Sequence, residues 1–200
     1  ALYANEIPFS FRVVGPGDPQ AGEELARLWP MNRFPVLVDD GVTVIESSII
    51  IEHLMLHHPG RLRLIPADPK AALEARFLDR FFDNYVQTPL QKVVSDAMRP
   101  AGERDARGVG DARAMLETSY AWLERHMAGR EWAAGGAFSL ADCAAAPALF
   151  YADWTHAIGP QFPVVRAYRA RLNAYPAFAR AIDGGRPYRP LFPLGAPDRD

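Results

Sequence analysis

The fold of this chain is decided by residues 33–54, which read RFPVLVDDGVTVIESSIIIEHL. Pro35 opens a short apolar run, and Asp40-Gly41 is a strong signal for a two-residue hairpin turn. Residues 42–45 supply a partner strand, and an apolar helix follows from Ser47. The stretch therefore predicts a strand, a tight turn, a second strand and a helix, in that order.

The combination of these features carries more information than any one of them. Proline is common at the first residue of a strand, because no ladder hydrogen bond is lost there. Ser47 by itself would also serve as an ordinary helix N-cap. Taken together, however, Phe34-Pro35, the hairpin and Glu46-Ser47 closely resemble the glutathione-binding half of glutathione transferases. The resemblance implies a thioredoxin-like α/β domain with a cis peptide bond at Phe34-Pro35.

The resemblance also implies how glutathione is held. A cis peptide turns the backbone N–H and C=O of Phe34 outward, where an extended tripeptide pairs with them like an added strand. The N–H groups of the following helix N-terminus, together with the Ser47 hydroxyl, suit the γ-glutamyl carboxylate. Glu46 suits the γ-glutamyl ammonium group, and Arg33 faces the glycine carboxylate. Glutathione is thus the expected co-substrate.

Composition limits the class of protein. The 200 residues are 49% hydrophobic and 23% charged, which is enough to build a full core in one large or two small domains. The net charge of -2 gives no strong attraction to nucleic acid or to an anionic membrane, and the sequence has no apolar run long enough to span a membrane. One cysteine excludes an internal disulfide and fits a reducing, cytoplasmic location.

The chain is predicted to contain two domains. The short, proline-bearing stretch at 61–68 reads as a linker. It separates a thioredoxin-like domain at 1–60 from an all-helical domain at 69–183. A tail rich in proline and glycine follows at 184–200, and its composition argues against regular helix there.

The N-terminal part begins abruptly. Residues 1–8 read as the last turns of a helix that ends at Pro8, and residues 9–14 alternate like a half-buried strand. A loop at 15–19 leads to a short helix at 22–28. In the resembled family the first strand, the loop with the thiol-activating residue and most of the first helix precede this point. We therefore expect the catalytic residue upstream of Ala1.

The second half reads as helical. The pattern predicts one long helix at 71–98, kinked by Pro89, a glycine-containing break at 99–110, and a helix at 111–127. Two further helices are expected at 163–174 and 176–182.

The helix predicted at 71–98 is too apolar for a single buried stripe. One face is expected to meet the core and another a partner or a ligand, although a helix sandwiched inside its own domain would also fit. The candidates for an apolar substrate pocket are Phe81, Tyr85 and Met98. By resemblance the protein is a homodimer, in which Asp79 or Asp83 approaches the γ-glutamyl group bound by the partner chain.

A second signature lies at residues 138–147, FSLADCAAAP. Ser139 and Asp142 have the spacing of an acidic capping box at a helix start. Before a small-residue helix, this pair resembles the capping box of the glutathione transferase C-terminal domain, so Asp142 is interpreted as structural. Cys143 is expected to be a buried packing residue, because no histidine or lysine is near it in sequence to activate it.

Three histidines near the end of the helix that follows the hairpin raise the question of a metal site. The spacing of His53 and His57 suits two ligands on one helix face. No cysteine is nearby, and the helix dipole favours histidine in a last turn in any case. We therefore predict no metal at His53, His57 and His58.

The resemblance covers nearly the whole chain and implies an enzyme of detoxification. The expected reaction attaches the glutathione thiolate to a small apolar electrophile. Two alternatives remain open: a non-catalytic binding or regulatory protein with the same fold, and a glutathione-dependent peroxidase, dehalogenase or isomerase. The residue types that would separate them are expected upstream of Ala1.

Overall fold

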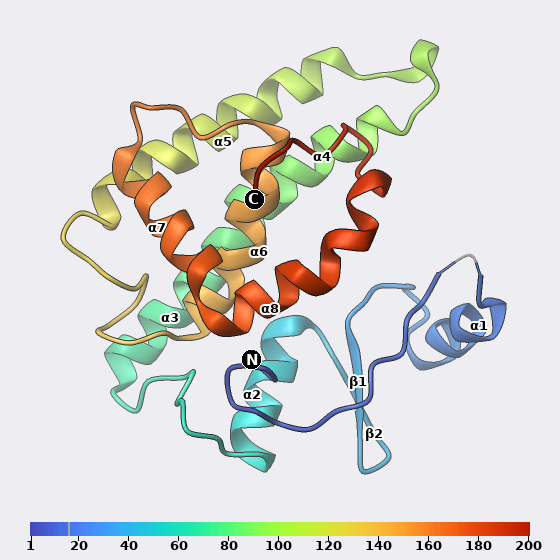
Figure 1. Cartoon of the computed structure of the whole chain (residues 1–200), viewed down its shortest axis with the longest axis vertical. Helices are drawn as coiled ribbons and strands as arrows, with labels where there is room; N and C mark the ends of the chain where they lie inside the picture. Colours follow the sequence, from blue (N-terminus) through green and yellow to red (C-terminus); the bar gives the residue numbers. More distant parts are fainter. Residues whose placement is uncertain (16) are drawn as a thin grey trace. The chain divides into compact units, whose positions relative to one another are not determined.

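The chain forms two compact units, Ala1–Ile65 and Pro66–Asp200. The computed structural model describes residues 1–15 and 17–200, so Pro16 of the predicted loop lies outside the described residues. Figure 1 shows the elements of each unit along the chain. The division between the units falls within the linker predicted at 61–68.

The first unit contains the predicted hairpin and the helix after it. Its elements are α1 (Pro19–Leu28), β1 (Val36–Asp39), β2 (Val42–Ile45) and α2 (Ser47–His57). Asp40 and Gly41 have φ values of 48° and 80°. A two-residue turn with two positive φ angles is of type I′, which matches the twist of the paired strands. The hairpin prediction is confirmed.

The core of this unit forms where β2 meets α2. Val44, Ile50 and Leu54 are buried, and Leu2 and Ile7 from the start of the chain pack against them. Of the apolar residues of α2, Ile49 and Leu56 lie on the outside and are largely exposed.

The start of the chain, which the sequence predicted to be the last turns of a helix, forms one hydrogen-bonded turn and no regular helix. The Ile7 N–H donates to the Leu2 carbonyl at 3.0 Å, the Glu6 N–H donates to the Tyr3 carbonyl at 3.3 Å, and Glu6 has a φ of 54°. This pair of bonds around a left-handed residue is the Schellman arrangement that ends helices, and Pro8 follows where the helix could not continue.

The strand predicted at residues 9–14 was wrong. This segment has no regular secondary structure, and Phe11 is 81% exposed. A strand requires a neighbour for its backbone N–H and C=O groups, and among the described residues only β1 and β2 pair with each other. The helix predicted at 22–28 begins earlier, at Pro19, because the Asp18 side chain accepts a hydrogen bond from the Ala21 N–H at 3.0 Å and caps it.

The second unit is helical. Its elements are α3 (Pro69–Phe81), a π-helix (Phe82–Gln87), α4 (Thr88–Ala97), a 3₁₀ turn (Ala101–Glu103), α5 (Ala106–His126), α6 (Leu140–Thr155), α7 (Pro163–Ala174), α8 (Pro176–Gly185) and a second 3₁₀ segment (Arg186–Leu191). The central element is α6, which contacts α3, α4 and α7 and is buried along most of its length (Figure 1).

The single long helix predicted at 71–98 is interrupted by the π-helix. Pro89 has no N–H for the carbonyl four residues before it, which is that of Tyr85. The Ser119 hydroxyl from α5 donates to this carbonyl at 2.7 Å, and the Thr88 hydroxyl donates to the Asp83 carbonyl at 2.9 Å. The proline is therefore accommodated by a wider helical turn, and the carbonyl that it leaves without a backbone donor is bonded by a side chain from another helix.

The helix predicted to start at residue 111 starts at Ala106. Asp105 caps it by accepting a hydrogen bond from the Gly108 N–H at 2.8 Å, while the Lys92 ammonium group of α4 pairs with the same carboxylate. A Cβ at Gly108 would lie 2.2 Å from the Asp105 carboxylate. This glycine permits a close approach inside the helix rather than breaking it.

The last helices agree with the prediction at α7, and α8 is longer than predicted. The tail is more regular than its composition suggested, because α8 reaches Gly185 and residues 186–191 form a 3₁₀ segment. Proline has no N–H to contribute at the start of a helical segment, so Pro187 is tolerated near the start of this one.

The capping box predicted at the start of α6 is present, and its carboxylate is fully buried. One oxygen of Asp142 accepts hydrogen bonds from the Ser139 N–H at 2.9 Å and the Ser139 hydroxyl at 3.1 Å. The other accepts bonds from the Ala133 N–H at 2.9 Å and the Tyr168 hydroxyl of α7 at 2.6 Å. Burial raises the pKa of Asp142 above its usual value, and these four hydrogen bonds oppose that effect.

Replacing Asp142 by alanine should destabilise the second unit severely. The change leaves the N–H groups of Ser139 and Ala133 and the Tyr168 hydroxyl without an acceptor, at about 1–3 kcal/mol for each buried donor. We expect a loss of at least about 3 kcal/mol in the free energy of unfolding, measured by urea denaturation.

Tyr168→Phe is the matched control. It removes one hydrogen bond to the same carboxylate and leaves the other donors paired, so its cost should be about 1.5–3 kcal/mol, as for a hydrogen bond to a charged group. An Asp142→Ala variant no less stable than Tyr168→Phe would contradict the role given to this carboxylate.

Candidate functional site

The hairpin brings two separate stretches of sequence to one end of the sheet. Val36 of β1 is the register partner of Ile45 of β2. Pro35 precedes the first of these residues and Glu46 follows the second. Partners across an antiparallel pair lie about 4.5–5.5 Å apart, so Phe34-Pro35 and Glu46-Ser47 adjoin at the end opposite the turn.

Phe34-Pro35 presents backbone groups that are not used inside the unit. The peptide bond between these residues is cis, as predicted. Phe34 is 77% exposed, and within residues 1–15 and 17–200 its N–H and C=O form no hydrogen bond. Arg33 is also exposed. This segment therefore offers a donor, an acceptor and a positive charge to a ligand.

Glu46-Ser47 forms the junction between β2 and α2. Glu46 occupies the N-cap position with φ 68° and ψ 122°, and its side chain makes no capping bond. Ser47 is the first residue of the helix and not its N-cap, so the simpler capping interpretation does not hold. Holding a non-glycine residue at such a φ costs on the order of 1–3 kcal/mol, and such residues concentrate at functional sites.

The N-terminus of α2 is open. The first intrahelical bond runs from the Ile50 N–H to the Glu46 carbonyl at 2.8 Å. The N–H groups of Ser47 and Ile49 find no carbonyl acceptor in the described part of the chain. These donors and the positive end of the helix dipole are suited to a carboxylate.

The residues predicted for a substrate pocket lie in the second unit, and only two of them are in contact. The ring of Phe81 is buried, 5.5 Å from the ring of Tyr85 and 4.4 Å from that of Trp122. Tyr85 is 46% exposed. Met98 follows the end of α4, 13 residues after Tyr85, which corresponds to roughly 20 Å along a helix.

Asp79 and Asp83 are both paired with the same arginine of their own chain. The Arg80 guanidinium contacts the Asp79 carboxylate at 2.8 Å and the Asp83 carboxylate at 2.6 Å. Asp79 is buried and Asp83 is partly exposed.

Two of the three histidines at the end of α2, His53 within the helix and His58 directly after it, share a partner that the sequence pattern did not indicate. The Nε2 atoms of His53 and His58 each lie 2.8 Å from the same oxygen of Asp39, on β1. The His57 ring packs against that of His53, with centroids 4.3 Å apart. The described residues include no group of three His, Cys, Asp or Glu side chains arranged to hold a metal.

Cys143 has the environment of an unreactive thiol. The residue is partly exposed, so the prediction of a buried packing residue was wrong, although desolvation still raises the pKa of the thiol to about 11. A thiol with a raised pKa stays protonated at neutral pH. Because the thiolate is the reactive form of cysteine, Cys143 is not activated as a nucleophile.

The architecture defines the class of protein: a thioredoxin-like unit with a hairpin and a cis-proline, joined to an all-helical unit. The family model of the glutathione S-transferase N-terminal domain matches residues 1–62, and that of the C-terminal domain matches residues 101–184. The chain belongs to the glutathione S-transferase family.

Individual relatives cover most of the chain. A probable maleylacetoacetate isomerase of Vibrio cholerae is 30% identical over 195 residues, which cover 94% of this chain and 89% of that protein. A glutathione S-transferase of Methylobacterium radiotolerans, solved in complex with glutathione sulfonate, has a TM-score of 0.78 and 28% identity, covering 90% of this chain and 85% of that one. Another from Methylobacillus flagellatus, with GSH bound, has a TM-score of 0.78 and 25% identity, covering 90% and 89%.

None of the helices in residues 1–15 and 17–200 has the length and apolarity needed to cross a membrane.

Asp39, His53 and His58 form a cluster whose contribution to stability should depend on pH. The hydrogen bond from His53, and to a smaller extent the one from His58, lowers the pKa of Asp39 below its usual value. A carboxyl group with a depressed folded-state pKa stabilises the fold above its unfolded pKa of about 3.9, and this stabilisation is lost as the pH falls through the folded value. Asp39→Asn should therefore lower the melting temperature at pH 6, and the difference from the wild type should shrink below about pH 4.

Asp40→Asn is the control, since it makes the same charge change at the neighbouring, exposed turn position. Asparagine tolerates the left-handed backbone of that turn, so the control should melt like the wild type. A difference between Asp39→Asn and the wild type that stays constant down to pH 3 would contradict the assignment.

Proposed function

We propose that this chain binds glutathione at the end of the hairpin opposite the turn and adds the glutathione thiolate to a small, mostly apolar electrophile. The observation that carries the proposal is the junction of Phe34-Pro35 with Glu46-Ser47, where unpaired backbone groups, a hydroxyl and a helix N-terminus meet. Membership in the glutathione S-transferase family supports a glutathione-dependent activity in general.

The backbone groups suit the peptide part of glutathione. The N–H and C=O of Phe34 would pair with the cysteinyl residue as an added strand would. The γ-glutamyl carboxylate would accept hydrogen bonds from the Ser47 hydroxyl and from N–H groups at the start of α2, where the helix dipole favours a negative charge.

The two charged side chains suit the two remaining charges of glutathione. The Glu46 carboxylate would pair with the γ-glutamyl ammonium group, and the Arg33 guanidinium with the glycine carboxylate at the other end of the tripeptide. Both side chains are exposed, so each would lose part of its hydration when the ligand binds, and the pairing would have to compensate for that loss.

Binding in this orientation fixes the thiol for reaction. The thiolate is the nucleophile, so a protein group must lower the thiol pKa, and none of the residues described above is assigned that role. Cys143 is unsuited to thiol chemistry of its own. Phe81, Tyr85 and Met98 remain the candidates for an apolar substrate pocket, and the rings of Phe81 and Tyr85 are in contact.

A glutathione-dependent isomerase is the second candidate. The observation that favours it is the similarity to the probable maleylacetoacetate isomerase of Vibrio cholerae. A thiolate that adds to a carbon–carbon double bond next to a carbonyl converts it to a single bond, which rotates, and departure of the thiolate then restores the double bond. Glutathione is regenerated in such an isomerisation and consumed in a conjugation.

The two reactions are distinguished by thiol consumption. The protein would be incubated with glutathione and either 1-chloro-2,4-dinitrobenzene or maleylacetoacetate. In conjugation the sulfur displaces chloride and free thiol falls with product formation, whereas in isomerisation product forms at constant thiol. Glutathione binding without turnover of either compound would favour a binding or regulatory protein of the same fold.

Ser47→Ala should weaken glutathione binding about tenfold or more, because it removes a charge-assisted hydrogen bond worth roughly 1.5–3 kcal/mol. Calorimetric titration of both proteins with glutathione measures the change. Thr43→Val is the control, since Thr43 carries an exposed hydroxyl on β2 away from the junction. Equal affinity of Ser47→Ala and the wild type would remove the proposed site.

A homodimer formed through α3 is the proposed assembly. Leu73 and Phe77 of α3 are 69% and 50% exposed, and they line a shallow groove of about 620 Å³ with Lys70, Ala71 and Glu74. Exposed apolar side chains gathered in this way are typical of an interaction surface.

Leu73→Glu should convert the dimer to a monomer in sedimentation at micromolar concentration, because it places a charge within the proposed apolar contact. Leu56→Glu on α2, where the leucine is 77% exposed, is the matched control and should leave the assembly unchanged. If the wild type sediments as a monomer, the proposed interface is wrong.

A further inference from the structure

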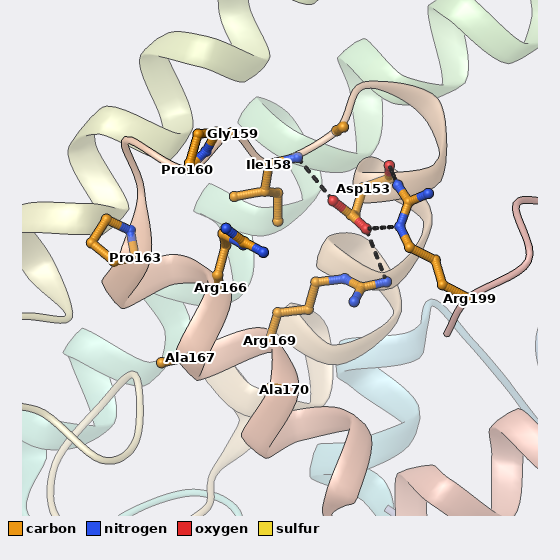
Figure 2. Close-up of a pocket in the computed structure, with 11 residues that line it drawn as sticks. Asp153, Ile158, Gly159, Pro160, Pro163, Arg166, Ala167, Arg169, Ala170 and Arg199 are labelled. Carbon is orange, nitrogen blue, oxygen red and sulfur yellow. Dashed lines mark hydrogen bonds and ion pairs between the residues drawn. The ribbon is translucent and has the colours of Figure 1, made fainter.

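A second pocket lies entirely within the helical unit, and it shares no residue with the proposed glutathione site. Its volume is about 760 Å³, within the range of small-molecule sites. Its walls come from the end of α6, the connection to α7, the first turns of α7, and Arg199 of the tail (Figure 2). Three of the lining residues are arginines and one is an aspartate.

Two of the three arginines are paired inside the protein. Asp153 of α6 accepts a hydrogen bond from the Arg199 Nε at 3.2 Å and lies 3.4 Å from a terminal nitrogen of Arg169. The other Asp153 oxygen accepts a bond from the Ile158 N–H at 2.8 Å. The single carboxylate of the pocket is therefore already in use.

Arg166 has no such partner. It lies one turn before Arg169 on α7, and both side chains rise from the same side of the helix into the pocket (Figure 2). The backbone N–H of Arg166 donates to the Phe162 carbonyl at 3.1 Å, but within the described residues its guanidinium forms no hydrogen bond or ion pair, and the residue is exposed. Because Arg169 is already paired with Asp153, Arg166 is the lining arginine whose side chain is available to an anion.

The start of α7 does not supply an anion site of its own. The N–H groups of Val164 and Val165 donate to the two oxygens of Glu124, at 3.0 and 2.9 Å. A negative charge already occupies this helix end. Any anion in the pocket would therefore have to be recognised by Arg166, since Arg169 and Arg199 are paired with Asp153.

The rest of the lining is apolar. It consists of Ala157, Ile158, Pro160, Pro163, Ala167 and Ala170, with Gly159 between them. Ile158 is buried and Ala167 and Ala170 stand on α7 beside the arginines. An inorganic anion would leave these walls in contact with water, whereas a ligand with an apolar body would cover them.

We propose that this pocket is a second ligand site, which binds a small organic carboxylate by pairing the carboxylate with Arg166 and packing the apolar body of the ligand against Ile158 and Pro160. A guanidinium offers a planar pair of donors that matches a carboxylate. The pocket shares no residue with the proposed glutathione site, and neither assignment depends on the other.

The test is calorimetric titration of the full chain with 4-phenylbutanoate, compared with its uncharged amide and with inorganic phosphate. We expect the carboxylate to bind and to raise the melting temperature, and the amide and phosphate to bind at least about tenfold more weakly. Arg166→Gln should weaken binding of 4-phenylbutanoate at least about tenfold. Because Arg166 has no internal partner, this variant should melt like the wild type.

Two controls make the result specific. Arg113→Gln makes the same charge change at an exposed position on α5, outside the pocket, and should bind 4-phenylbutanoate like the wild type. Ser47→Ala should also bind it normally, which separates this site from the proposed glutathione site.

The proposal is overturned if 4-phenylbutanoate does not bind up to about 10 mM, or if Arg166→Gln and Arg113→Gln bind it equally. Equal affinity for the amide would overturn the pairing with Arg166. Equal affinity for phosphate would overturn the assignment to an organic acid.

Discussion

The register of the β1–β2 hairpin is the constraint on which the first unit depends. The type I′ turn at Asp40-Gly41 pairs Val36 with Ile45. A slip of one residue would turn Val44 out of the core and would also displace Glu46 from its place beside Pro35. The same short turn therefore sets the hydrophobic face and the arrangement of the candidate glutathione site.

The second unit depends on polar groups that are satisfied between elements far apart in sequence. The Asp142 carboxylate joins the start of α6, the segment before it and Tyr168 of α7. The Ser119 hydroxyl supplies the hydrogen bond to Tyr85 that Pro89 cannot provide. Buried polar groups are costly when unpaired, so these contacts specify how the helices pack as well as contributing to stability.

Charged side chains of the two units end either paired within the protein, as Asp39 does, or without an internal partner, as the Arg166 guanidinium does. Asp39 becomes the shared hydrogen-bond partner of His53 and His58, a pairing that the spacing of the histidines in the sequence did not indicate. Arg166 stands in a pocket whose one carboxylate is bound to other groups. An internally paired charge contributes to the fold, and an unpaired charge in a pocket is available to a ligand.

The sequence by itself determined what depends on neighbouring residues: the hairpin, the bounds of α7 and the capping box of α6, because turns and caps involve backbone groups only a few residues apart. The cis peptide bond at Phe34-Pro35 was predicted from the resemblance to glutathione transferases and not from local pattern. The tertiary structure alone decided the rest. The segment at 9–14 has no ladder partner, the helix at 71–98 contains a π-helix that Ser119 supports, and Asp39 and Arg166 acquire their surroundings from distant elements. Such pairings depend on which groups meet in space, and local sequence patterns carry no information about that.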